Sequence, residues 1–255
     1  MKRPWLAAAL PIIAALAASP AMADEDTPGA QDSPWSGEGS ISAGVTTGNT
    51  DTTDIAIALK LQLDQGDWTH KAKFSFDYAE QQSIESKNRG LLAYQLNWAM
   101  SERAFAFGRT SYERDEFSGF DSRFFLGVGL GYYLIPLEDT TWTVQAAPGL
   151  RVDDVRTVEA TETEEGVEGG TEESLALTLG SVFEHKFNPA VSLSNETEIV
   201  FADVSSQAKN TFAVTAQFTD RLSGRFSYEV RYESAPPDGL ESTDTASRFG
   251  IVYGF

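Results

Sequence analysis

After Trp35 the chain alternates apolar and polar side chains with a period of two over most of its length. In one clear example, an apolar series alternates with a series of small and polar residues: Ile55, Ile57, Leu59, Leu61 and Leu63 alternate with Asp54, Ala56, Ala58, Lys60 and Gln62. In an extended chain, successive side chains point to opposite faces, so this period is typical of β-strands with one apolar and one polar face. We count twelve such segments up to Phe255, and the sequence therefore predicts an all-β protein.

The length of the segments favours a membrane barrel over a soluble sheet. A soluble sandwich or lipocalin-like protein also has strands with one apolar face. The segments here run to roughly a dozen residues, against about 5 to 6 in soluble sheets and about 9 to 11 for a tilted membrane crossing. Aromatic residues stand at many segment ends, as in the girdles of membrane barrels: Trp68, Trp98, Tyr132, Trp142, Phe183, Phe187 and Phe255.

The charged side chains of the segments fall at the alternate positions that carry polar residues, called the polar parity here; the apolar parity is the other set of positions. Facing lipid, each basic one would cost about 2 to 4 kcal/mol at the membrane midplane, whereas inside a cylinder it can pair across strands. The candidate lumen-lining residues are Lys60, Lys71, Lys73, Asp77, Arg151, Glu196, Glu198, Arg225, Glu229, Arg231 and Arg248. The sequence thus predicts a transmembrane antiparallel β-barrel of about 12 strands, and a soluble periplasmic β-barrel binding protein is the alternative.

Turn-forming residues alternate with longer connections along the chain. Tight turns are expected at the following places: 65–67, 101–102, 136–140, 188–189 and 220–223. The connections between them are mostly longer. This asymmetry predicts short periplasmic turns and longer extracellular loops.

The N-terminus predicts export. Lys2 and Arg3 precede an apolar run that is too short for a membrane-spanning helix, and Ala21-Met22-Ala23 has the small-x-small pattern of a signal-peptidase site. We therefore expect a signal peptide over 1–23, cleaved after Ala23, a disordered lead over 24–34, and a barrel over 35–255 in the outer membrane.

Composition excludes several functions. Formal net charge is −19, from 19 basic and 38 acidic residues, so the chain is not expected to bind nucleic acid. It contains no cysteine, which excludes disulfides and cysteine-based metal or nucleophile chemistry. No cofactor is expected.

The longest connection, between about Asp153 and Glu173, is acidic. It holds Asp153, Asp154, Glu159, Glu162, Glu164, Glu165, Glu168, Glu172 and Glu173, with Arg156 as the one basic residue. A solvated acidic loop on the extracellular side is the expected interpretation. Loose binding of divalent cations is the alternative, because the spacing lacks the pattern of a calcium-binding loop.

Two features of the expected lumen remain open. Its charges suit either a narrow pore or salt bridges that hold the barrel together. Gly127, Gly129 and Gly131 leave an inward gap for water or for a large opposite side chain.

The segment from Arg103 to Asp115 fits the pattern poorly, because Phe105 and Phe107 share the parity of Arg109. We expect a bulge or an early exit from lipid there, and Arg109 is assigned to neither face.

Catalytic residues are sparse. The two histidines, His70 and His185, lie on the lipid-facing parity near short turns. Ser181 and Asn195 share that parity with His185, which leaves a lipid-modifying enzyme as an alternative. Because nothing in the sequence enforces hydrogen bonds among these three residues, we expect no catalysis.

Short motifs connect the chain to a known family. The opening Trp35-Ser36-Gly37, the Gly48-Asn49-Thr50 element and the terminal Phe255 after alternating strands resemble the YdiY-like family of salt-induced outer-membrane proteins. The resemblance covers about 35–255. It implies an outer-membrane barrel whose domain has no assigned function, so it transfers no functional residues.

These observations together predict a structural, envelope-stress or small-solute permeability role without enzymatic activity. The expected partners are outer-membrane lipid and lipopolysaccharide. The barrel-assembly machinery is expected to recognise the C-terminal strand that ends at Phe255.

Overall fold

The structure is a computed structural model that describes residues 33–47, 52–81, 84–157, 169–203, 205–236 and 241–255. The expected signal peptide and all but the last two residues of the expected lead lie outside this part. No helix within it is long and apolar enough to cross a membrane.

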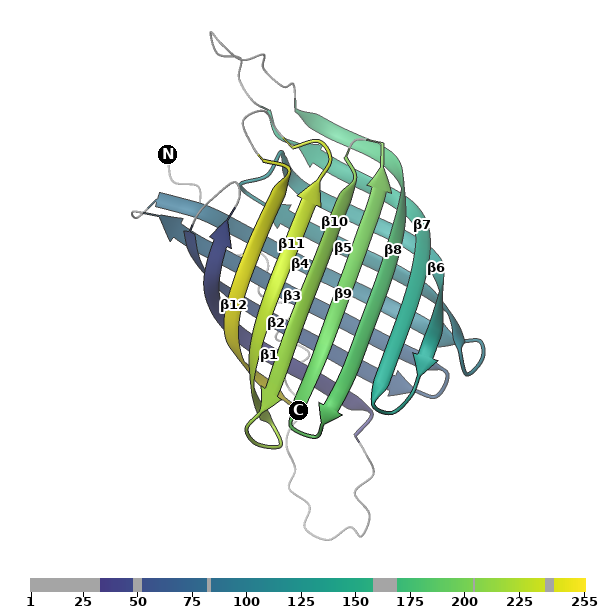
Figure 1. The fold of residues 1–255 in the computed structure, drawn as a ribbon. Coiled ribbons are helices and arrows are strands. Elements are labelled where there is room, and N and C mark those ends of the chain that lie inside the picture. The colour runs from purple at the N-terminus through teal and green to yellow at the C-terminus, as the bar shows by residue number, and fades with distance from the viewer. Residues whose placement is uncertain (1–32, 48–51, 82–83, 158–168, 204, 237–240) are drawn as a thin grey trace, which may run out of the picture. The chain divides into compact units, whose positions relative to one another are not determined.

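Twelve antiparallel strands make up the described part between Trp35 and Gly254 and close into a barrel (Figure 1). They are β1 (Trp35–Thr47), β2 (Thr52–Gln65), β3 (Trp68–Gln81), β4 (Ile84–Ala99), β5 (Ala104–Asp115), β6 (Phe120–Pro136), β7 (Thr140–Val155), β8 (Gly170–Asn188), β9 (Val191–Ala202), β10 (Gln207–Gln217), β11 (Leu222–Glu233) and β12 (Thr243–Gly254). The predicted fold class and strand number are confirmed.

The first and last strands close the cylinder. β1 pairs with β12 from Glu38 opposite Gly254 to Thr47 opposite Thr245. Beyond the last strand residue, Gly37 N donates to Phe255 O at 2.9 Å and Phe255 N donates to Gly37 O at 3.0 Å. Every strand therefore has two hydrogen-bonded neighbours, which removes the unpaired edges that lipid does not tolerate.

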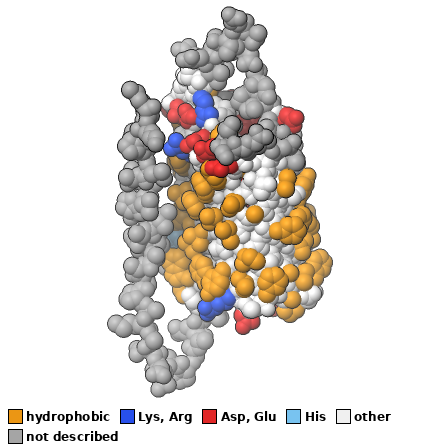
Figure 2. Space-filling view, turned by 90° about the vertical axis from the view of Figure 1, so that its left-hand side faces the viewer, with side chains coloured by type: hydrophobic (Ala, Val, Ile, Leu, Met, Phe, Trp, Pro, Cys, Tyr) orange, Lys and Arg blue, Asp and Glu red, His pale blue; other side chains and the backbone are white. Residues whose placement is uncertain are grey.

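The apolar parity faces outward. Figure 2 shows hydrophobic side chains over the middle of one side of the barrel, with charged side chains gathered toward the two ends. On β6, for example, Val128 is 69% exposed although it is aliphatic and lies in mid-strand. Aromatic pairs lie near one end of the barrel, with ring centroids 6.2 Å apart for Trp68 and Trp98 and 6.5 Å apart for Trp142 and Phe183. This distribution matches an apolar belt with an aromatic girdle.

The two rims differ in their connections. The terminus rim carries Trp35, Phe255 and five turns of two to four residues, and glycine at Gly66 there accommodates a φ of 60°. On the far rim, two connections are longer, 156–169 and 234–242. The other far-rim connections span only two to four residues, because the strands extend further than the sequence pattern indicated.

Strand β5 departs from the expectation of a bulge or an early exit from lipid. It pairs with β4 and β6 without a register shift. Phe105 and Phe107 point inward, where they are 3% and 5% exposed and lie opposite Gly131 and Gly129 of β6. The aromatic rings fill the space that the glycines leave, so the inward gap is occupied by side chains. The same parity places Arg109 in the lumen.

We expect Val128→Arg to lower the free energy of unfolding in lipid vesicles by about 2 to 4 kcal/mol, because the charge would lie within the apolar belt. Leu137→Arg is the matched control, since Leu137 is 62% exposed but lies in the β6–β7 turn. Urea titration of vesicle-folded protein measures both. Equal, small effects would indicate that water surrounds the belt.

We expect Gly131→Ala to destabilise the barrel by about 1 to 3 kcal/mol, because a Cβ there would lie 2.0 Å from Phe105 Cζ. Gly108→Ala on β5 is the control, since a Cβ at Gly108 meets nothing within 4 Å. The same urea titration applies. Adding Phe105→Ala should remove most of the penalty of Gly131→Ala, and an undiminished penalty in the double variant would contradict the packing argument.

Candidate functional site

The polar parity of the strands faces the lumen. Lys73 Nζ of β3 lies 3.4 Å from Glu196 Oε1 of β9, and Arg109 Nη1 of β5 lies 2.5 Å from Glu198 Oε2 of β9. These strands are not neighbours in the sheet. Such side chains can meet only across the interior of the closed cylinder, so the lumen is the candidate functional site.

The larger cavity of the lumen, called the vestibule here, has a volume of about 670 Å³. Its lining residues come mostly from the strand halves next to the terminus rim. The charged ones are seven cations and four carboxylates: Lys60, Lys71, Lys73, Arg109, Lys186, Lys209 and Arg225, and Glu38, Glu184, Glu196 and Glu198. The vestibule is therefore net positive inside a chain with a formal charge of −19.

Three of the four vestibule carboxylates are paired. Glu38 accepts two hydrogen bonds from Arg225, both at 2.8 Å, and lies 3.4 Å from Lys60. Glu196 and Glu198 have the partners on β3 and β5 named above. Lys71 and Lys186 make no ion pair with any residue that the structure describes. The vestibule thus has positive charge that is available to an anionic solute.

The half of the lumen next to the far rim is filled by buried ion pairs, called the ion-pair network here. In one part of it, Arg248 of β12 binds Asp54 of β2 at 2.5 Å and Asp77 of β3 at 3.2 Å. Asp54 has no solvent exposure. These contacts span β12 to β3 along one side of the lumen.

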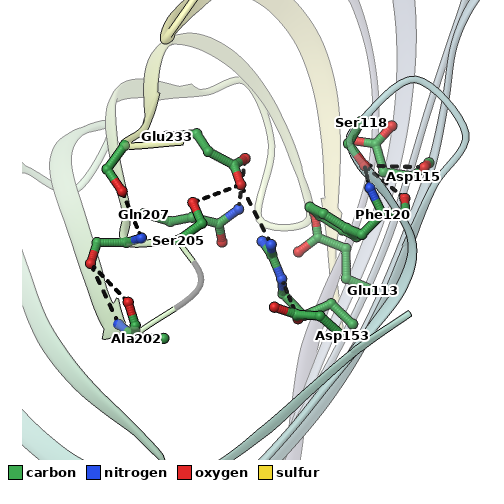
Figure 3. Close-up of polar contacts among 12 residues, drawn as sticks. Glu113, Asp115, Ser118, Phe120, Asp153, Ala202, Ser205, Gln207 and Glu233 are labelled. Carbon is green, nitrogen blue, oxygen red and sulfur yellow. Dashed lines mark hydrogen bonds and ion pairs between the residues drawn. The ribbon is translucent and has the colours of Figure 1, made fainter. Parts of the chain in front are cut away.

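The second part of the ion-pair network centres on Asp153 of β7. This carboxylate binds Arg151 at 2.5 Å and Arg123 at 2.8 Å, and Arg123 also reaches Glu233 of β11 at 3.5 Å. Figure 3 shows Glu233 and Asp153 in this cluster, with Ser205 hydrogen-bonded to Glu233. Because β7 and β11 are not neighbours, these contacts also bridge the lumen.

A second, small cavity of about 70 Å³ adjoins the vestibule. Leu91, Arg109, Glu198 and Lys209 line both cavities. The ion pair between Arg109 and Glu198 therefore lies at the boundary between the open and the filled half of the lumen.

The structure places the eleven candidate lumen residues in the interior. Six line the vestibule: Lys60, Lys71, Lys73, Glu196, Glu198 and Arg225. Arg151 and Arg231 line the small cavity. Asp77, Glu229 and Arg248 belong to ion pairs of the interior.

Several interior charges were not assigned to the lumen from the sequence. They are Glu38, Asp54, Lys87, Arg89, Arg109, Glu113, Arg123, Glu184, Lys186 and Lys209. Counting parity from the nearest tight turn would have found most of them. In β5 this count misleads, because Phe105 and Phe107 point into the lumen, whereas apolar residues at such positions of other strands face outward.

The acidic segment is shorter than the sequence indicated. Asp153 and Asp154 belong to β7, and Glu172 and Glu173 belong to β8, so assigning these four to the loop was wrong. Asp153 is a buried lumen residue instead. The remaining acidic positions, Glu159, Glu162, Glu164, Glu165 and Glu168, lie outside the described residues. Among the described residues there is no group of three or more acidic or histidine side chains that could hold a metal ion.

The candidate catalytic residues do not bond to one another. Ser181 Oγ accepts a hydrogen bond from Trp142 Nε1 at 3.0 Å, and His185 Nδ1 lies 2.8 Å from Thr140 Oγ1. Asn195 exchanges hydrogen bonds with Asn210 at 3.1 Å. His70 Nδ1 lies 2.7 Å from the Tyr94 hydroxyl. Each of these hydrogen bonds joins a candidate residue to a side chain of a neighbouring strand.

We expect Arg248→Gln to cost about 3 to 5 kcal/mol of stability, because it removes the cation that Asp54 and Asp77 share and leaves the fully buried Asp54 with only Lys87 at 3.8 Å. Arg225→Gln should cost about 1 kcal/mol or less, since its partner Glu38 keeps Lys60 and both side chains are about a quarter exposed. Urea titration in vesicles compares them, and equal losses would contradict the difference between the two halves of the lumen.

Two solved structures have folds similar to this barrel. The structure of the NanC porin superposes with a TM-score of 0.55 at 10% sequence identity, covering 84% of this chain and 98% of that one. The translocator domain of the autotransporter NalP from Neisseria meningitidis superposes with a TM-score of 0.50 at 13% identity, covering 90% of each chain. At these identities the likeness concerns the fold alone. Among curated proteins, none matches this sequence.

A family model agrees with the resemblance seen in the sequence motifs. It matches residues 39–255, which include eleven of the twelve strands completely and most of β1. The family is described as "Protein of unknown function, DUF481". The match covers most of the chain, and the chain therefore belongs to this family.

Proposed function

We propose that the protein is an outer-membrane barrel that gives small anionic solutes a path through its lumen and performs no catalysis. The observation that carries the proposal is the net positive vestibule of about 670 Å³ in a strongly acidic chain. Cations on the walls of a low-dielectric passage raise the local concentration of anions and repel cations.

The distribution of lysines supports this function. The chain has seven lysines, and Lys2 is the one that precedes the barrel. Five of the other six line the vestibule, and Lys87 Nζ lies 3.8 Å from Asp54 Oδ2 in the lumen. A lysine on the belt would be costly to desolvate, but that cost does not explain why none lies in the turns of the described part. Concentration inside the lumen favours a role in attracting anions.

The exterior supports a position in the outer membrane. The exposed aliphatic belt would be costly in water and is favourable against acyl chains. The N-terminal export pattern and the terminal Phe255 agree with secretion followed by insertion through the barrel-assembly machinery. Lipid and lipopolysaccharide are then the surroundings of the belt and of the far rim.

A closed barrel with a structural or envelope-stress role is the second candidate. The ion-pair network favours it, because it fills the lumen next to the far rim with paired charges, and the contact of Arg123 on β6 with Glu233 on β11 bridges opposite walls. Conduction through the barrel would have to pass the Arg109–Glu198 pair and this network. We therefore expect any open state to have a small conductance.

Planar bilayers with a potassium chloride gradient test the proposal. The wild-type protein should give a small conductance with a reversal potential displaced toward that of chloride. Combining Lys71→Glu with Lys186→Glu should displace the reversal potential toward that of potassium, because both substitutions reverse charges that have no ion-pair partner among the described residues. Arg103→Glu, in the exposed β4–β5 turn, is the control and should have little effect.

Two outcomes would contradict the proposal. Absence of conductance from protein shown to be folded would favour the closed structural barrel. Cation selectivity of the wild-type protein would show that the vestibule charges do not govern passage.

A further inference from the structure

Four polar side chains lie together on the outer wall of the barrel. They belong to β8, β9 and β10, which lie side by side at the front of Figure 1. The four are Ser181, Asn195, Thr197 and Asn210, called the outer polar patch here. In the register of the sheet, Ser181 lies opposite Thr197 and Thr197 lies opposite Asn210. The patch is therefore one continuous surface across three strands.

The outer polar patch faces away from the lumen. On β9 its two members alternate with Glu196 and Glu198, which form ion pairs inside the barrel. On β10 its member follows Lys209, which lines the vestibule. Successive side chains of a strand point to opposite faces, so the patch shares the outer wall with the exposed Leu177 and Phe201. It is a polar area within the apolar belt.

The depth of the patch in the membrane follows from strand length. β9 and β10 have 12 and 11 residues, and a tilted crossing needs about 9 to 11. The ends of these two strands therefore lie near the two membrane interfaces. Thr197 is the seventh residue of β9, which places it near the middle of the crossing. At that depth acyl chains offer no hydrogen bond, and a polar group without a partner is costly.

The side chains of the patch satisfy one another in part. Asn195 and Asn210 exchange two hydrogen bonds of 3.1 Å, and Asn210 also donates to Thr197 at 2.7 Å. An amide nitrogen has two hydrogens, and Asn195 Nδ2 uses one of them within the described residues. Ser181 Oγ accepts from Trp142 Nε1, and its own hydrogen has no acceptor in the described part of the chain. Hydrogen-bonding capacity thus remains on the lipid-facing surface.

We propose that the outer polar patch is the contact surface of a dimer of this chain in the membrane. Asparagine, serine and threonine side chains hold membrane segments together, because lipid cannot replace their hydrogen bonds. Amides and hydroxyls both donate and accept, so the patch on one copy is complementary to the same patch on a second copy.

Membrane insertion restricts the symmetry of such a dimer. Two copies that insert by the same route have their terminus rims on the same side of the membrane. The axis that relates them is therefore parallel to the membrane normal, and residues meet residues at the same depth. A two-fold axis of this kind brings one surface against itself, which places each outer polar patch against that of the other copy.

The dimer rests on the membrane position that is part of the proposed function, but it does not depend on conduction. Each barrel keeps its own lumen, so association and current are measured separately. A monomeric barrel that conducts anions would reject the dimer and leave the passage of solutes intact.

Energy transfer between labelled copies in lipid vesicles tests the proposal. The chain has no cysteine, so Glu102→Cys in the exposed β4–β5 turn gives one labelling site. Mixed donor- and acceptor-labelled barrels should show transfer that persists on dilution with lipid until the dimer dissociates. Combining Asn195→Leu, Thr197→Val and Asn210→Leu should raise the Kd at least about tenfold. Because the mutually bonded groups are replaced together, none of them is left without its partner and the fold is retained.

A second outward hydrogen-bonded pair provides the matched control. His70 Nδ1 on β3 lies 2.7 Å from the Tyr94 hydroxyl on β4, and β3 is six strands from β9 in either direction around the barrel. His70→Leu with Tyr94→Phe should leave the Kd unchanged. Transfer in the unsubstituted barrel no greater than random proximity predicts would overturn the proposal, as would an equal Kd in the patch variant and the control.

Spin labels determine which walls meet without removing the two amides. Thr197→Cys labels the patch, and Leu92→Cys labels an exposed outward position of β4, five strands away. These sites lie six and seven residues from the terminus-rim ends of their strands, so their depths are similar. The spin–spin distance between two copies should be shorter for Thr197→Cys than for Leu92→Cys. The reverse order, or equal distances, would show that a different face is in contact.

Discussion

Closure of the backbone hydrogen bonds is the constraint on which the rest of the structure depends. Twelve strands each have two partners, and the last residue, Phe255, still exchanges hydrogen bonds with Gly37 of the first strand. Once no backbone group needs solvent, the outer wall can be wholly apolar. The pleat then sends every second side chain inward, so charged residues enter the lumen as a geometric consequence of the same closure.

The two halves of the lumen accommodate these charged side chains in different ways. Next to the far rim, carboxylates and guanidinium groups pair in a space from which water is largely excluded, as at Asp54 with Arg248 and at Asp153 with Arg123 and Arg151. Next to the terminus rim, five lysines line a cavity of about 670 Å³. The difference follows from side-chain size and pairing, since the backbone cylinder is continuous through both halves. One half is therefore suited to holding the walls together and the other to receiving a solute.

Parity in the sequence was sufficient to place the lumen residues wherever a strand keeps its apolar side chains outside. Lys60, Lys73 and Glu198 follow from that rule, and the structure finds all three in the vestibule. The rule failed in β5, where Phe105 and Phe107 pack inward over glycines of β6. It also gave no information on strand ends, so Asp153 was placed in a loop although it is a buried strand residue.

By itself the sequence determined the all-β class, the number of strands and the sidedness of most of them, because a period of two and the turn-forming residues are local properties of the chain. Only the tertiary structure decided which charges meet. Lys73 and Glu196 are 123 residues apart, and Arg248 and Asp54 are 194 apart. Such pairs depend on the barrel's register and diameter, which bring together side chains of strands that are not sheet neighbours. The cavities arise from that same arrangement, and no local pattern encodes them.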